Sequence, residues 1–133
     1  MTDQRGTPLA VEVTEANLHD MKAATQTLDG IAVRRPRATA THPQHLCLDK
    51  GYDYPEIEAA VRTRGYMPHI RHRGEVVPRR KRHPARRWVV ERTASWHNRF
   101  RKLLTRFEKR VENYLGLVHF ACCLIVYRRM VLG

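Results

Sequence analysis

Cysteine is scarce in this sequence, and the few cysteines present are poorly spaced for cross-linking. Cys47, Cys122 and Cys123 are the three in the chain, and two of them are adjacent. This spacing matches neither a zinc site nor the disulfide framework of a secreted protein. We therefore expect the cysteines to serve as small apolar residues in a reducing cytoplasm.

Long apolar runs are also lacking. The only candidate for a membrane segment, residues 115–127, is short for a span, contains His119 and runs directly into Arg128 and Arg129. The first residues, Met1 to Gly6, include no apolar stretch of the kind that signal peptides carry. The sequence therefore predicts a buried core helix near the C-terminus and no membrane partner.

Acidic residues are few relative to basic ones. The 133 residues contain 13 Asp and Glu against 25 Lys and Arg, which gives a net charge of +12. A compact chain with this excess repels itself, so the composition favours a polyanionic partner, most often nucleic acid. A charge that merely keeps the chain in solution is the alternative. With 42% hydrophobic residues the chain can bury a core, which excludes a disordered protein.

Apolar spacing and turn residues predict an α/β domain. The expected strands cover residues 8–13, 45–48 and 66–70, and the expected helices cover residues 17–28, 54–64, 85–114 and 117–132. The third helix is expected to be long because residues 85–114 contain no Pro or Gly, and Gly116 predicts a break after it.

A turn at residues 3–6 precedes the first expected strand. Such a turn usually closes a hairpin, yet almost nothing stands before it in the sequence. We therefore expect the partner strand to be missing and the chain to be a piece of something longer.

Residues 71–87 form a basic loop in this interpretation. They include eight Lys or Arg, two Pro and one Gly. The central cations are Arg79, Arg80, Lys81 and Arg82. These side chains are expected to contact the DNA backbone, and a loop that is merely solvated is the alternative.

Two acids, Asp49 and Glu91, are the candidates for chemistry. Asp49 ends an apolar strand and is followed closely by Gly51, which is typical of a site at the carboxyl edge of a sheet. A salt bridge between Asp49 and Lys50 or a nearby Arg explains it equally well. Glu91 lies off the apolar stripe of its helix, where a surface pair with Arg87 or Arg92 is the simpler explanation. Considered together, the two acids suit Mg²⁺, because this ion prefers oxygen ligands. Two such ions bound side by side support the cleavage and transfer of phosphodiesters.

Two blocks give the sequence a family resemblance. Leu48-Asp49-Lys50-Gly51-Tyr52-Asp53 and the segment from Trp88-Val89-Val90-Glu91-Arg92-Thr93 to Lys102 resemble the DDE transposases of the insertion sequence five group. Residues 6–9, 16–20 and 106–115 resemble other segments of the same proteins, so the resemblance covers nearly the whole chain.

The resemblance implies a ribonuclease H-like fold with two C-terminal helices. Asp49 matches the second catalytic acid and Glu91 the third, as ligands of Mg²⁺ or Mn²⁺, and Arg87 matches an Arg that contacts phosphate. The family's first acid and first strand lie upstream of residues 6–9, so the fold is expected to be incomplete. Pro84 and Asn98 depart from the family pattern, and Arg99 and Lys102 are expected to replace the basic residue lost at position 98.

Residues 1–133 are thus interpreted as the C-terminal part of a DDE transposase catalytic domain, which is inactive alone. The implied partners are DNA at element ends and target, the product of an upstream reading frame, and a second copy in the complete enzyme. The expected location is the bacterial cytoplasm, at the nucleoid. The alternatives are a DNA-binding remnant without chemistry and, more remotely, a basic RNA-binding protein.

His69 and His72 are not expected to bind metal, Asp20 and Asp53 are expected to be structural, and Trp88 and Trp96 are assigned to packing.

Overall fold

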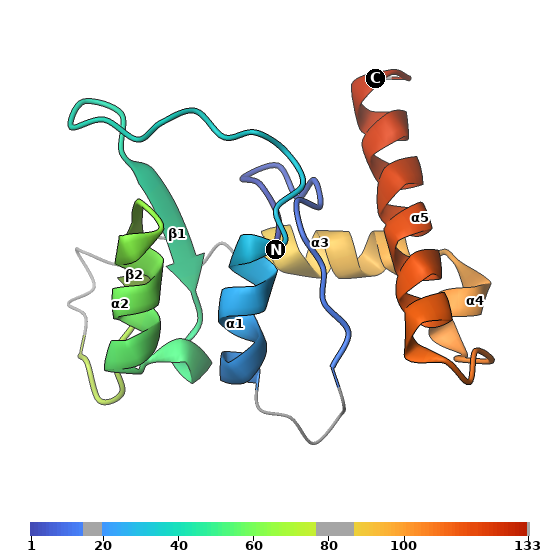
Figure 1. Ribbon diagram of the computed structural model, residues 1–133, viewed down its shortest axis with the longest axis horizontal. Coiled ribbons are helices and arrows are strands. Elements are labelled where there is room, and N and C mark those ends of the chain that lie inside the picture. The colour runs from blue at the N-terminus through green and yellow to red at the C-terminus, as the bar shows by residue number, and fades with distance from the viewer. Residues whose placement is uncertain (15–19, 77–86, 133) are drawn as a thin grey trace. The chain divides into compact units, whose positions relative to one another are not determined.

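The computed structural model describes residues 1–14, 20–76 and 87–132 (Figure 1). The chain divides into two compact units. The sheet unit comprises the described residues of Thr14–Asp29 and Val33–His83. The helical unit comprises Met1–Val13, Gly30–Ala32 and the described residues of Pro84–Gly133. Each unit has its own core, and each is described by itself.

The sheet unit is built around two parallel strands joined by a helix. Its elements are α1 (Asp20–Asp29), β1 (Gln44–Leu48), the short 3₁₀ helix η1 (Lys50–Tyr52), α2 (Pro55–Thr63) and β2 (Tyr66–Ile70). The strands pair in register from Gln44 opposite Tyr66 to Leu48 opposite Ile70. This β-α-β arrangement confirms both predicted strands, and a parallel pair requires such a crossover connection.

One face of the two strands is covered by helix and the other is open. Leu46 and Tyr66 are buried in the core with Ile57 and Val61 of α2. His45 and Met67, which alternate with them along the strands, are exposed. Helix α2 packs on β2, and Figure 1 shows α2 in green running alongside the strands. Burial on only one face follows the two-residue repeat of a strand.

The start of the helical unit is a tight, hairpin-like turn rather than a strand. Asp3 caps it, because its carboxylate accepts hydrogen bonds from the amides of Arg5 and Thr7 at 2.8 and 2.7 Å. Thr2 and Pro8 form an isolated antiparallel bridge, and the Met1 carbonyl accepts from the Leu9 amide at 3.0 Å. The strand expected at residues 8–13 is therefore wrong, because Pro8 alone of these residues takes part in a bridge.

Three helices follow in the helical unit: α3 (Arg87–His97), α4 (Arg101–Leu104) and α5 (Val111–Met130). The prediction of one helix over residues 85–114 is wrong, since the backbone is extended at Phe100, Thr105 and Arg110. These breaks let both α3 and α4 pack against α5, so tertiary burial outweighs the absence of Pro and Gly. Gly116 lies inside α5, so the break expected there is also wrong.

The core of the helical unit lies between α3 and α5, with the N-terminal turn against α3. Its buried aliphatic residues are Val89, Val118, Ala121 and Ile125. Gly6 has a φ of +82°, and a Cβ built on it would come within 3.2 Å of the Thr93 hydroxyl oxygen and 3.3 Å of the Val89 carbonyl oxygen. Glycine therefore allows both the left-handed turn and the close approach to α3.

The described helices include none that could cross a membrane, because none combines the necessary length with sufficient apolar character. The long helix α5 ends on Arg128 and Arg129 and begins with Glu112. The described cysteines are all free thiols, with Cys47 and Cys123 exposed.

Candidate functional site

Asp49 lies at the carboxyl edge of the parallel strands. Strand β1 ends at Leu48 directly opposite Ile70, the last residue of β2, so Asp49 and Arg71 leave the sheet at the same edge. Both side chains are exposed. Open α/β sheets bind ligands at this edge, so the structure places Asp49 where the sequence predicts a site.

The Asp49 carboxylate is oriented by its own turn. Its Oδ1 accepts a hydrogen bond from the Gly51 amide at 2.8 Å and so caps η1. Among the described residues Asp49 takes part in no ion pair, so the salt bridge with Lys50 or an Arg is not found. A Cβ at Gly51 would come within 3.0 Å of the same carboxylate oxygen, so a larger residue there would displace the carboxylate by a few tenths of an ångström.

A second acid, Asp53, ties together the two loops at this edge. Its carboxylate accepts hydrogen bonds from the His72 ring at 2.7 Å and from the Arg73 amide at 2.8 Å. The bond from the Arg73 amide, followed by the bond from His72, lowers the pKa of Asp53. The Asp53 carboxylate in turn raises the pKa of His72. Asp53 therefore serves a structural purpose, in agreement with the sequence interpretation of this residue.

Glu91 belongs to the helical unit, on the outward side of α3. Val89 and Thr93, two positions before and after it, are buried, whereas Glu91 is exposed. A two-residue step along a helix is a turn of about 200°, which explains why Glu91 points away from the core. Arg92 lies over the Trp88 ring at 4.3 Å instead of pairing with Glu91, and no ion pair of Glu91 occurs in the described part of the chain.

Some of the residues predicted to contact phosphate lie outside the described ranges, and two of the others are exposed. Arg79, Arg80, Lys81 and Arg82, with Pro84, lie outside the described residues, and of Arg87 only its place at the start of α3 is described. Arg99 is exposed just beyond the end of α3, and Lys102 is exposed on α4. The expected helix over residues 85–114 would hold both Glu91 and Lys102, but the two lie on different helices because α3 ends at His97.

The two tryptophans of α3 are placed differently from each other. Trp88 is 48% exposed, so its assignment to packing is wrong, and its ring is instead partly covered by Arg92. Trp96 is half-buried, with the guanidinium of Arg129 from α5 at 5.0 Å from its ring centroid. The assignment of Trp96 to packing is confirmed.

A histidine pair occurs that the sequence interpretation missed. His45 Nδ1 and His69 Nε2 lie 2.6 Å apart on the exposed face of the strands, and His72 instead pairs with Asp53. The signal lay in the parallel pairing, which brings residues 24 positions apart side by side. Within the described ranges no group of three or more His, Cys, Asp or Glu residues is placed to hold a metal ion.

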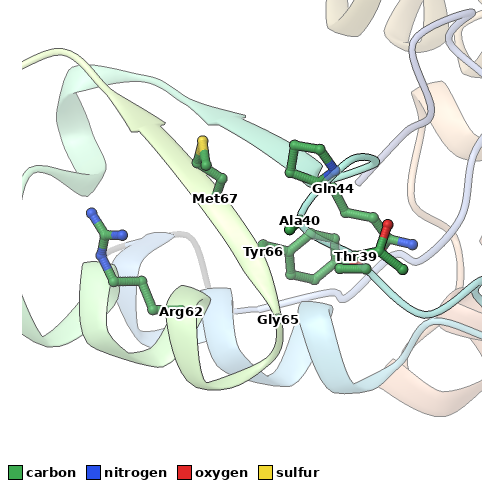
Figure 2. Close-up of a pocket in the computed structure, with 9 residues that line it drawn as sticks. Thr39, Ala40, Gln44, Arg62, Gly65, Tyr66 and Met67 are labelled. Atoms are coloured by element: carbon green, nitrogen blue, oxygen red, sulfur yellow. The ribbon is translucent and has the colours of Figure 1, made fainter.

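A hollow among the described residues lies at the opposite edge of the strands (Figure 2). It measures about 360 Å³ and is shallow and open to solvent. Figure 2 shows Gln44 and Tyr66, the first residues of the two strands, beside Thr39. Since these residues are at the amino ends of the strands, the hollow is separate from Asp49, and the chemistry is not assigned to it.

The chain is similar to known proteins over most of its length. Residues 1–126 match the family described as "Transposase DDE domain". The chain is 35% identical over 136 residues to a Burkholderia cepacia protein named "Putative transposase for insertion sequence element IS402". The alignment covers 98% of this chain and 62% of that relative, so the chain spans about three fifths of its length. No solved structure matches the chain.

Proposed function

The chain belongs to the transposase DDE domain family, and from this premise we propose that it supplies two acids of a metal-dependent site that cuts and joins DNA. Asp49 is the second acid of that site and Glu91 the third. The reaction is strand cleavage and strand transfer at the ends of an insertion sequence, in the bacterial cytoplasm at the nucleoid. Assignment to the insertion sequence five group is part of the proposal.

The position of Asp49 is the observation that carries the proposal. An exposed carboxylate stands at the carboxyl edge of a parallel pair, held by a backbone amide and unpaired with any described cation. Glu91 is likewise an exposed carboxylate, directed away from its core. Carboxylate oxygens are the donors that Mg²⁺ and Mn²⁺ prefer, so both residues fit such an ion by their chemistry.

Each residue then has a defined task. Divalent ions, when bound, supply Lewis acidity at the phosphodiester and lower the pKa of the attacking hydroxyl or water. Asp49 and Glu91 hold these ions through their oxygens. Arg87 and the basic loop, with Arg99 and Lys102, bind phosphates and so fix the DNA in register.

The proposed fold of the complete protein is ribonuclease H-like. The mixed α/β structure with a small parallel sheet is consistent with it, and the family resemblance places a first strand and a first acid before residues 6–9. Two acids leave such a metal site under-coordinated. We therefore expect no cleavage by the 133 residues alone, and a dimer of the complete enzyme to join two element ends.

Strand cleavage of labelled element-end DNA with Mn²⁺ tests this proposal. The 133-residue chain is compared with a longer chain that joins it to the upstream reading frame. The longer chain is expected to cut, and Asp49→Ala or Glu91→Ala to lower the rate by at least about 10³-fold. The exposed acids Glu56 and Glu112, when changed to Ala, serve as matched controls that leave cleavage intact. Cleavage that survives Asp49→Ala contradicts the assignment.

DNA binding without cleavage is the second candidate function, favoured by the net charge of +12. In that case both the chain and its longer form bind DNA, neither cuts it, and Asp49→Ala changes nothing. An RNA-binding role would show instead as a preference for RNA over DNA duplex that is equally indifferent to Asp49.

A further inference from the structure

Asp53 uses both of its carboxylate oxygens to hold one distant segment. Oδ1 accepts from His72 Nδ1 at 2.7 Å, and Oδ2 accepts from the Arg73 amide at 2.8 Å, across 19 and 20 positions of the sequence. The Asp53 side chain is only 19% exposed. Both oxygens of the Asp53 carboxylate therefore accept hydrogen bonds, whereas Asp49 uses one. These bonds hold the segment after β2 against the segment after β1. We refer to these contacts as the Asp53 clasp.

The clasp leaves the side chain of Arg73 available for an external anion. The guanidinium lies 5.5 Å from the Tyr54 ring centroid, with a long hydrogen bond of 3.4 Å to the Tyr54 hydroxyl. No ion pair of Arg73 is present among the described residues. The hydrogen bonds from the Arg73 amide and from His72 lower the pKa of Asp53, and the charge of Arg73 lowers it further. A cation that is partly ordered by an aromatic ring and makes no direct ion pair loses little freedom when it binds phosphate.

A second arginine of the sheet unit shows the contrast. The Arg64 guanidinium donates to both oxygens of Asp29 at 2.7 Å and also to the Ala60 carbonyl at 3.0 Å. The N–H donors of Arg64 are therefore largely bonded to groups of the sheet unit, as expected of a cation that stabilises the fold. Asp53, in contrast, accepts a hydrogen bond from the backbone amide of Arg73, and the side chain of Arg73 is exposed.

The register of the two strands determines where Arg73 lies. Asp49 is the first residue after β1 and Arg73 the third after β2, and the two strands end opposite one another. We propose that Asp53 is a positioning residue that presents Arg73 at the Asp49 edge as a contact to the phosphate backbone of DNA. This inference rests on the proposed function, since it takes DNA as the substrate. Arg73 is one of the eight cations of residues 71–87, and the inference adds how Asp53 holds that one in place.

Equilibrium binding of a fluorescently labelled DNA duplex across a salt series tests the role of Arg73. Arg73→Ala is expected to reduce the slope of log K against log salt by about 0.9, which corresponds to about an eightfold loss of affinity at 0.1 M salt. Arg73→Lys keeps the charge and is expected to restore the slope. Asp53→Asn is expected to lose part of the same affinity, and the double variant to bind no more weakly than Arg73→Ala alone.

Asp29→Asn is the matched control, because it removes an acid that pairs with arginine elsewhere in the same unit. Its effect on the salt slope is expected to be nil. Equal losses from Asp29→Asn and Asp53→Asn, or strictly additive losses from Asp53→Asn and Arg73→Ala, would overturn the proposal. So would Arg73→Lys behaving like Arg73→Ala.

Hydrogen exchange of the Arg73 amide gives a readout that does not depend on DNA. Asp53→Asn is expected to speed this exchange several-fold, as the charge-assisted bond to the amide is weakened. If the wild-type chain binds no DNA, the proposed function and the role of Arg73 fail together, whereas the exchange result still decides whether the clasp exists. Unchanged exchange in Asp53→Asn overturns the clasp even if DNA binding is strong.

Discussion

Local contacts give the acidic residues Asp49, Asp53 and Glu91 different tasks. Asp49 keeps an exposed carboxylate with one oxygen on the Gly51 amide. Asp53 spends both oxygens on His72 and Arg73. Glu91 stands exposed on α3 without an ion pair to any described residue. The availability of the carboxylate, rather than the presence of an acid, separates a proposed metal ligand from a structural one.

Gly51→Ala is predicted to disturb Asp49 without unfolding the sheet unit. A Cβ at this position lies 3.0 Å from Asp49 Oδ1, so the carboxylate must move by a few tenths of an ångström or more. In the longer chain, we expect Mn²⁺-dependent cleavage to fall by about 10²-fold, because metal and substrate geometry tolerate little displacement. Gly116→Ala is the control, since its Cβ meets nothing within 4 Å. Full cleavage by Gly51→Ala would show that the orientation of Asp49 does not matter.

The pKa of His72 is predicted to fall when Asp53 is replaced by Asn. The hydrogen bond to Asp53 is the main cause of its raised pKa, with smaller contributions from Glu75 and Glu58. The His72 contribution to the clasp is fully present below the unfolded pKa of about 6.5 and is lost as pH rises through the folded value. The contribution of Asp53, whose pKa is lowered, is present above about pH 4 and is lost as pH falls through its folded value. An NMR titration checks this, and Glu75→Gln should lower the His72 pKa by less than Asp53→Asn does.

At the scale of elements, the helical unit depends on a turn packed against a helix. Gly6 brings the N-terminal turn onto α3, where the buried Thr93 hydroxyl lies 2.6 Å from the Gly6 carbonyl oxygen and 3.1 Å from the Val89 carbonyl oxygen. Thr93 lies on the buried side of α3. Helix α3 has a buried side, which makes this contact, and an exposed side, which carries Glu91.

Thr93→Val is predicted to destabilise the helical unit by about 1–3 kcal/mol. The substitution keeps the shape of the side chain but leaves the buried Gly6 carbonyl without its donor. Urea unfolding followed by circular dichroism measures the loss. Thr93→Ser retains the hydroxyl and should lose clearly less, and Thr105→Val, at an exposed position, should be close to neutral. Equal stability of Thr93→Val and the wild type would mean that the hydrogen bond contributes nothing net.

At the scale of the whole molecule, charge dominates. Twelve net positive charges on 133 residues create a field that attracts any polyanion, independently of which residues touch it. The described cations divide into those with an ion pair, such as Arg62 and Arg64, and exposed ones with no ion pair to a described residue, such as Arg99 and Lys102. Only the second group is free to exchange salt counterions for phosphates.

The salt dependence of DNA binding is therefore predicted to separate these groups. Joint replacement of Arg99 and Lys102 by Ala should reduce the slope of log K against log salt by about 2, at about 0.9 per phosphate contact. Replacing the four basic-loop residues Arg79, Arg80, Lys81 and Arg82 by Ala should reduce it by about 3 to 4. Arg62→Ala, which breaks an internal pair with Glu58, should leave it unchanged. A slope that responds equally to all three changes would indicate a diffuse field without defined contacts.

Much of this protein follows from its sequence because the relevant signals are local. The apolar runs of β1 and β2, Pro55 at the start of α2 and the family motifs each span only a few residues. They predicted the order strand, helix, strand and the family, both of which are confirmed. The place of Asp49 at a strand end is of the same kind. Its role as a metal ligand, like that of Glu91, stays a prediction.

The tertiary structure decided what depends on contacts between distant segments. The break of the expected long helix into α3, α4 and α5 arises because packing against α5 stabilises more than unbroken helical hydrogen bonding between residues 97 and 111. Gly116 stays helical because its cost of about 1 kcal/mol relative to Ala is small beside the burial of Val118, Ala121 and Ile125 on the same helix. The Asp53 clasp exists only because parallel pairing brings the ends of β1 and β2 to one edge. A sequence records which groups can bind, whereas folding determines which of them are already bound and which remain free.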